Sequence, residues 1–206
     1  MAIHFEIHAQ IDHGLNTRYM LRSTYYVLSE NDSINAKENN LESILPIKYS
    51  GIFEEQKKEI IVIIDTLHQV GFEDNIIRFN LYVINNSDSN FHIPIIDEKL
   101  FMIAEVLKNK KWCPIKFVLE SNCGNSYSDI LFKQHTYWKL YTEKYAGNVR
   151  TKLRMKLKIQ DRYVFSNEIW TNINLSQLEF SNRIKDSSNS YFFDETFAAG
   201  ARNQFI

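Results

Sequence analysis

The chain has 206 residues, of which 44% are hydrophobic and 14% aromatic, with only six glycines and three prolines. This composition excludes collagen-like, proline-rich and intrinsically disordered classes, and the length suffices for one full core without disulfides or metal. The 24 basic and 25 acidic residues almost cancel, so the total charge of −1 does not by itself suggest a charged partner.

The first third of the chain predicts strands and a loop. Residues 2–11 predict a half-buried strand, because from Ile3 to Ile11 apolar side chains occupy the odd positions and polar ones the even positions. A turn follows at 12–14. Residues 17–28 are rich in tyrosine and favour a second strand, although a helix capped at Asn16 is an alternative. The polar residues 29–40 predict a surface loop.

The middle of the chain predicts alternating helices and strands. Residues 52–70 suggest a helix, with acidic residues in the first turn and Gly71 as its C-terminal cap. The run of β-branched residues at 60–64 indicates a buried strand by itself, but the segment length favours the helix. A strand over 75–84, an amphipathic helix over 96–108 and a strand over 112–119 follow. These last three could form a right-handed crossover between parallel strands.

The last third predicts a turn, a helix and a hairpin. Residues 123–128 suggest a polar turn, and the recurrence of tyrosine every four residues suggests a helix over 129–145. A strand over 149–159, an antiparallel partner over 162–172 and a short helix over 176–184 follow. We therefore predict an α+β fold, with a mixed or antiparallel sheet and several packed helices. One domain would span residues 1–186, followed by an aromatic-rich tail over 187–206.

Cysteine usage and hydropathy predict a cytoplasmic protein. Cys113 and Cys123 are too few for a disulfide framework and favour a reducing compartment. Charged and imidazole side chains interrupt the N-terminal stretch where a secretory signal needs an apolar core. The longest apolar run, at 60–64, is far shorter than the roughly 20 residues of a membrane-spanning helix. We expect no membrane span.

The near-zero total charge hides a division between the two halves of the chain. Residues 1–100 contain 8 basic and 15 acidic residues, a net charge of −7, whereas residues 101–206 contain 16 and 10, a net charge of +6. The basic half also carries a regular pattern of cations over 149–159. Its members alternate with apolar or small residues, and they are Arg150, Lys152, Arg154, Lys156 and Lys158.

In a strand these five cations would share one face, with successive cations roughly 6.6 to 6.8 Å apart. Three interpretations follow. The face could be solvated or compensated by acidic residues of the same chain, it could bind an acidic protein surface, or it could follow a nucleic-acid backbone. Tyr137, Trp138 and Tyr141 would offer stacking surfaces in the last case. The isoelectric point of 6.6 is low for a dedicated nucleic-acid-binding domain.

A second pattern lies at the N-terminus, where His4, Glu6 and His8 would share one face of the strand over 2–11. Imidazole and carboxylate ligands suit zinc or another transition metal. One strand cannot complete a tetrahedral site alone, so a further ligand would have to come from elsewhere, such as Asp65, Cys123 or His135. The alternative is a polar strand face in contact with solvent.

The sequence contains no phosphate-binding glycine loop, nucleophile elbow, zinc-protease helix motif or C-x-x-C pair, so we expect no cofactor and no enzymatic activity. The leading hypothesis is a cytoplasmic protein–protein interaction module, a subunit of a larger assembly or an inhibitor of a partner. It would bind through the cations of 149–159 and the tail residues Phe192, Phe193 and Phe197, which could also pack on their own domain. Nucleic-acid binding or processing and a metal-dependent enzyme are the alternatives.

Overall fold

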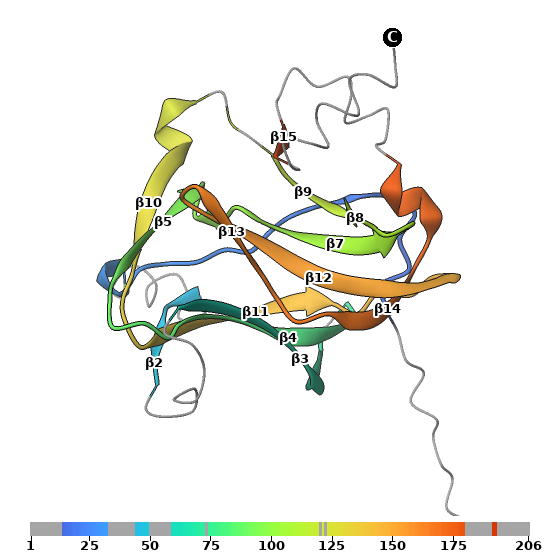
Figure 1. Ribbon diagram of the computed structural model, residues 1–206, viewed down its shortest axis with the longest axis horizontal. Coiled ribbons are helices and arrows are strands. Elements are labelled where there is room, and N and C mark those ends of the chain that lie inside the picture. Colours follow the sequence, from blue (N-terminus) through green and yellow to red (C-terminus); the bar gives the residue numbers. More distant parts are fainter. Residues whose placement is uncertain are drawn as a thin grey trace, which may run out of the picture.

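The computed structural model describes residues 14–32, 44–49, 59–72, 74–119, 121 and 123–179, and the backbone of 191–192. About 60% of the described residues are in β-strands, and the described part of the chain contains no helix of seven or more residues. The predicted α+β class with several packed helices is therefore wrong. The protein consists instead of stacked, mainly antiparallel sheets (Figure 1).

Two larger sheets face each other across the core (Figure 1). The four-stranded sheet is antiparallel, in the order β2 (Ile47–Lys48), β11 (Thr136–Glu143), β4 (Ile77–Asn85) and β3 (Ile60–Gly71). The five-stranded sheet has the order β13 (Arg162–Phe165), β12 (Val149–Ile159), β7 (Met102–Lys108) and β8 (Lys111–Pro114). Its fifth strand, β14 (Ile169–Ile173), pairs with the first half of β12, on the same side as β13.

Smaller elements complete the described part of the structure. One three-stranded sheet contains β10 (Tyr127–Phe132), β5 (Phe91–Ile96) and β6 (Lys99–Leu100). Another contains β1 (Leu21–Arg22), β9 (Lys116–Leu119) and β15 (Tyr191–Phe192), with β1 and β9 parallel. Short 3₁₀ turns are η1 (Glu30–Asp32), η3 (Gly124–Ser126) and η4 (Leu175–Leu178).

The core lies between the inner faces of the two larger sheets. Alternate residues of the four-stranded sheet point inward, including Val62, Leu81 and Trp138, each no more than 2% exposed. Met102 and Met155 are buried on the opposing sheet. Trp138 also stacks on Phe132, with 3.8 Å between ring centroids, and its indole N–H donates to the Leu28 carbonyl at 3.1 Å. The strand period of two thus places one side of each strand in the core.

The predicted helix over 52–70 is wrong for its described residues, because Ile60–Gly71 form the strand β3. Ile60, Val62 and Ile64 are buried and their neighbours Ile61 and Ile63 are half-buried, a period of two. The β-branched run therefore outweighs the capping signal, since β-branched side chains pack well on a pleated sheet.

The predicted helices over 96–108 and 129–145 are also wrong. Asp97 and Glu98 adopt the left-handed conformation, with φ of 46° and 61°, and form the turn between β5 and β6. In the second segment, a spacing of four residues is one helical turn but also two strand repeats, so Tyr137 and Tyr141 share a face of β11. The predicted parallel crossover fails too, because β4 and β8 belong to different antiparallel sheets.

Other predictions agree with the structure. β12 spans the predicted residues 149–159, and both β13 and β14 pair with it in antiparallel register. The predicted strand over 75–84 is confirmed as β4. The strand over 17–28 is reduced to β1 and a bridge between Tyr26 and Lys99. The predicted strand over 2–11 lies outside the described residues.

Candidate functional site

The five cations of β12 lie on the outer face of the five-stranded sheet. Thr151, Leu153, Met155, Leu157 and Ile159 are buried on the opposite side of the strand. The cross-strand register places Trp170 opposite Lys152, Glu105 opposite Arg154 and Phe165 opposite Lys156. Cations therefore alternate with aromatic and acidic side chains across this face.

One end of the face is open to solvent. Trp170 of β14 is 60% exposed, and the Arg150 guanidinium lies 4.8 Å from its ring centroid. The Lys152 ammonium lies 6.0 Å from the same ring and 2.7 Å from a carboxylate oxygen of Glu168. The cation–π contacts hold an arginine and a tryptophan together at the surface.

In the middle of the face, Arg154 is held between two rings. Its guanidinium lies 4.2 Å from the Trp112 ring centroid and 3.9 Å from that of Phe165. Both Nε and Nη2 donate to one oxygen of Glu105, at 3.0 and 2.9 Å. Phe165 remains 42% exposed, so this stack is also accessible from solvent.

The other end of the face is closed. Lys156 is only 3% exposed, and its ammonium lies 3.6 Å from Glu105 and 4.1 Å from the Tyr163 ring centroid. Lys158 is half-buried opposite Tyr163, and its backbone N–H donates to the Phe101 carbonyl. The five cations thus share a face, but the structure does not expose them equally.

We call the open part of this face the cation–aromatic surface, and it comprises Trp112, Arg150, Lys152, Arg154, Phe165, Glu168 and Trp170. Its three aromatic members and Glu105 were not singled out as site residues from the sequence. Because the sequence predicts a helix over 96–108, it does not place Glu105 on the same sheet face as the cations of 149–159. The alternation of Trp170 between buried Ile169 and Thr171 was the signal that could have identified an outward-facing tryptophan.

A second cluster of charges lies inside the protein. Lys116 of β9 is 1% exposed, and its ammonium lies 2.7 Å from Glu143 and 4.7 Å from the Tyr25 ring centroid. Burial disfavours both charges. For Glu143 the Lys116 ammonium outweighs burial and the pKa is lowered, whereas for Lys116 the neighbouring Tyr25 and Glu143 outweigh burial and the pKa is raised. Burial and the Glu143 carboxylate raise the pKa of Tyr145 well above its usual value.

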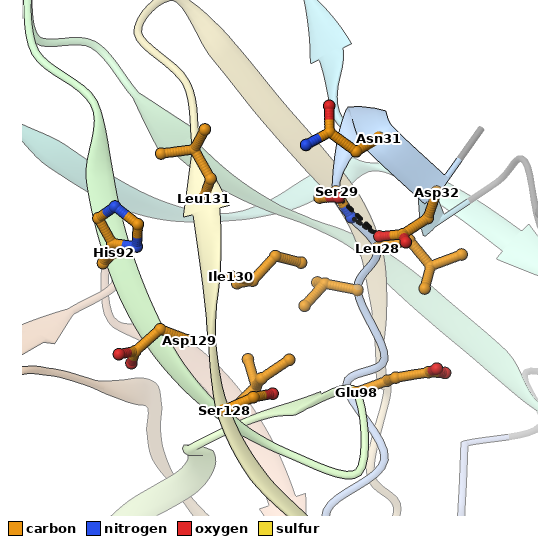
Figure 2. A pocket seen from close by; sticks show the side chains of 12 residues that line it. Leu28, Ser29, Asn31, Asp32, His92, Glu98, Ser128, Asp129, Ile130 and Leu131 are labelled. Atoms are coloured by element: carbon orange, nitrogen blue, oxygen red, sulfur yellow. Dashed lines mark hydrogen bonds between the residues drawn. The ribbon is translucent and has the colours of Figure 1, made fainter.

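A cavity of about 350 Å³ lies between residues 27–32 and the strands β5 and β10 (Figure 2). Figure 2 shows His92 and Asp129 on one wall and Ser29 and Asp32 on the other, with Ile130 between them. The Asp32 carboxylate accepts hydrogen bonds from the Ser29 hydroxyl at 2.6 Å and its backbone N–H at 2.9 Å. Asp32 is thus engaged with its own turn.

The remaining predicted site residues are placed only in part. His4, Glu6, His8, Phe193 and Phe197 lie outside the described residues, and Phe192 is described only through the backbone pairing of β15 with Val118. Within the described ranges, no group of three or more histidine, cysteine or acidic side chains is arranged to hold a metal ion. The metal hypothesis therefore stays a prediction.

Comparison with protein-family models, curated proteins and solved structures finds no match to this chain. Across the described residues, none of the helical turns has the length and apolar character needed to cross a bilayer.

Proposed function

We propose that this chain is a non-enzymatic interaction module that binds a protein partner with an acidic surface through the cation–aromatic surface. The observation that carries the proposal is the pairing of exposed Trp170 and Phe165 with Arg150 and Arg154 on one sheet face. Tryptophan and arginine dominate binding energy at protein interfaces, and stacked pairs lose little side-chain freedom on binding.

The balance of charge on this face supports an acidic protein more than a nucleic acid. Among the described residues, the surface cations Arg150, Lys152 and Arg154 exceed by one charge the two carboxylates that pair with cations of β12, those of Glu105 and Glu168. A surplus of positive charge attracts an acidic partner. The same two carboxylates would lie close to a bound phosphate backbone and oppose it, and this makes nucleic acid the weaker candidate.

We place this activity in the cytoplasm. Cys113 and Cys123 are both free thiols in the structure, which suits a reducing compartment. The partner would be another subunit of an assembly or a target that this chain inhibits.

The proposal is tested by capturing partners with the tagged full chain from a lysate of its source and quantifying them by mass spectrometry. Arg150→Glu and Trp170→Ala each should reduce one specific partner by about tenfold or more, because they remove an interface anchor. The matched control is Lys48→Glu, which makes the same change of charge on exposed β2 of the opposite sheet.

The captured protein is then purified and titrated against the chain by calorimetry. Loss of affinity for the two surface variants but not for Lys48→Glu supports the proposal, and equal affinity for all of them refutes it. Arg154 and Lys156 are unsuitable for charge reversal, because both contact the buried carboxylate of Glu105.

A further inference from the structure

Within the described part of the chain, the backbone of β14 has hydrogen-bonding groups at its outer edge that no other strand pairs with. In β12, the Lys158 N–H donates to Phe101 beside β7 at 2.9 Å, whereas the Met155 carbonyl accepts from Ser166 at 3.0 Å. Even-numbered residues of β12 therefore bond toward β7, and odd-numbered residues bond toward β13 and β14. The β14 residues opposite odd positions are Ile169, Thr171 and Ile173.

It follows that the N–H and C=O groups of Trp170 and Asn172 point away from β12. Among the described residues, neither main chain has a hydrogen-bond partner on the outer side. The two residues are two positions apart, roughly 6.6 to 6.8 Å, which is the repeat at which an added antiparallel strand forms its hydrogen bonds.

Two other edge strands of the larger sheets, β3 and β8, carry features that oppose such pairing. The edge of β3 is occupied at Ile64, whose N–H donates to the Asn167 side chain at 2.7 Å and whose carbonyl accepts from it at 3.0 Å. A register shift between Asp65 and Gln69 distorts the rest of β3. β8 contains lysine and proline. β14 has neither residue type and no shift in its register, so it lacks these protections.

A hollow of about 320 Å³ lies along this edge, lined by Arg150, Trp170, Thr171 and Asn172. Successive side chains of a strand point to opposite faces, so a hollow bordered by three successive residues follows the strand edge. Arg150 is the charged residue of the lining, which favours an anionic side chain in the occupant.

We infer that an extended acidic segment of the partner protein adds to the edge of β14 as an extra strand. The main-chain groups of Trp170 and Asn172 would form the hydrogen bonds, and Arg150 would select an acidic side chain. This inference rests on the proposed function and specifies how the partner is recognised.

The first test measures amide hydrogen exchange in the full chain by NMR. In the free protein, the amides of Trp170 and Asn172 should exchange fast and those of Ile169, Thr171 and Ile173 slowly, because only the latter bond to β12. If Trp170 and Asn172 are already protected without a ligand, the chain itself covers the edge and the inference is refuted.

The second test uses a fluorescent heptapeptide of alternating glutamate and valine as a probe, with a lysine–valine peptide for comparison. We expect the acidic peptide to bind and to protect the amides of Trp170 and Asn172. Asn172→Pro should weaken binding by about tenfold or more, since it removes an outward N–H, and Asn172→Ala should stay within about twofold. Proline at this position leaves the bonds to β12 in place.

The outcomes separate this inference from the proposed function. Any of three results refutes strand addition: Asn172→Pro binds the acidic peptide as tightly as the unmodified chain does, the lysine peptide binds as tightly as the acidic one, or the acidic peptide does not bind at about 1 mM. If the natural partner is still lost with Arg150→Glu but retained with Asn172→Pro, the surface is correct and the edge is not. If neither variant affects the partner, both proposals fail.

Discussion

The buried Lys116–Glu143 cluster and the cation–aromatic surface combine the same kinds of side chain in opposite surroundings. Each pairs a cation with a carboxylate and an aromatic ring, and the distance from ammonium to carboxylate is 2.7 Å both for Lys116 with Glu143 and for Lys152 with Glu168. Lys116 is 1% exposed, whereas Trp170 beside Arg150 is 60% exposed. A buried pair holds strands together and has no access to a ligand, while the exposed stacks can bind one.

The largest expected effect comes from breaking the buried pair. Lys116→Met leaves the Glu143 carboxylate buried without its cation and should lower the free energy of unfolding by about 3 to 5 kcal/mol in urea denaturation. The double variant Lys116→Met/Glu143→Leu should recover much of this loss, because no buried charge remains. A loss below about 1 kcal/mol for the single variant would show that Glu143 is solvated.

The second prediction compares two cations of the same strand. Lys156→Glu places a second carboxylate beside Glu105, where both side chains are 4% exposed, and should cost about 3 kcal/mol of unfolding free energy. Lys152→Glu changes the charge equally, but Lys152 is 40% exposed, so solvent screening should limit the cost to about 1 kcal/mol or less. Similar losses for both variants would contradict the division of the face into open and closed ends.

The third prediction concerns pH. The folded pKa of Glu143 is lowered from its ordinary value of 4.5, so its contribution is complete above that pH and is lost as pH falls through the lower folded value. The pKa of Lys116 is raised above 10.5, so its contribution is complete below that pH and is lost only as pH rises through the higher folded value.

This sign can be checked by denaturation between about pH 3 and 8, where Lys116 stays protonated. The stability advantage of the natural chain over Lys116→Met/Glu143→Leu should shrink toward the acidic end. An advantage independent of pH in this range would exclude a folded-state shift of the Glu143 pKa.

The smallest expected effect on stability comes from the exposed tryptophan. Trp170→Ala removes a surface ring and its contact with Arg150, so the free energy of unfolding should fall by about 1 kcal/mol or less. Calorimetric unfolding of this variant beside the natural chain provides the measurement. A much larger loss would assign Trp170 to the packing of the fold rather than to binding.

The strands were predictable where the local pattern has one interpretation. In β12, cations alternate with apolar or small residues over eleven positions, and a helix would scatter the five cations around its axis. Where a pattern suits both the strand period of two and the helix period of 3.6, the local sequence gives the wrong element. The tyrosine spacing in β11 and the run of β-branched residues before Gly71 in β3 also suit a helix, and only pairing with β4 identifies both as strands.

The candidate site was predictable only in part for a related reason. The cations of β12 follow from alternation, but Trp112, Glu105 and Trp170 meet them through strand pairing between residues far apart in sequence. The closed end at Lys156 also depends on neighbours, because exposure is a property of the packed sheet and not of one strand.

By itself, the sequence determined a folded chain with an acidic first half, a basic second half and one strand with its cations on a single side, since composition and a period of two are local properties. The tertiary structure decided which cations are buried, which carboxylates lie beside them and which strand edge is unpaired among the described residues. These depend on register between distant strands, and a shift of one residue in pairing would turn every side chain of a strand to the other face.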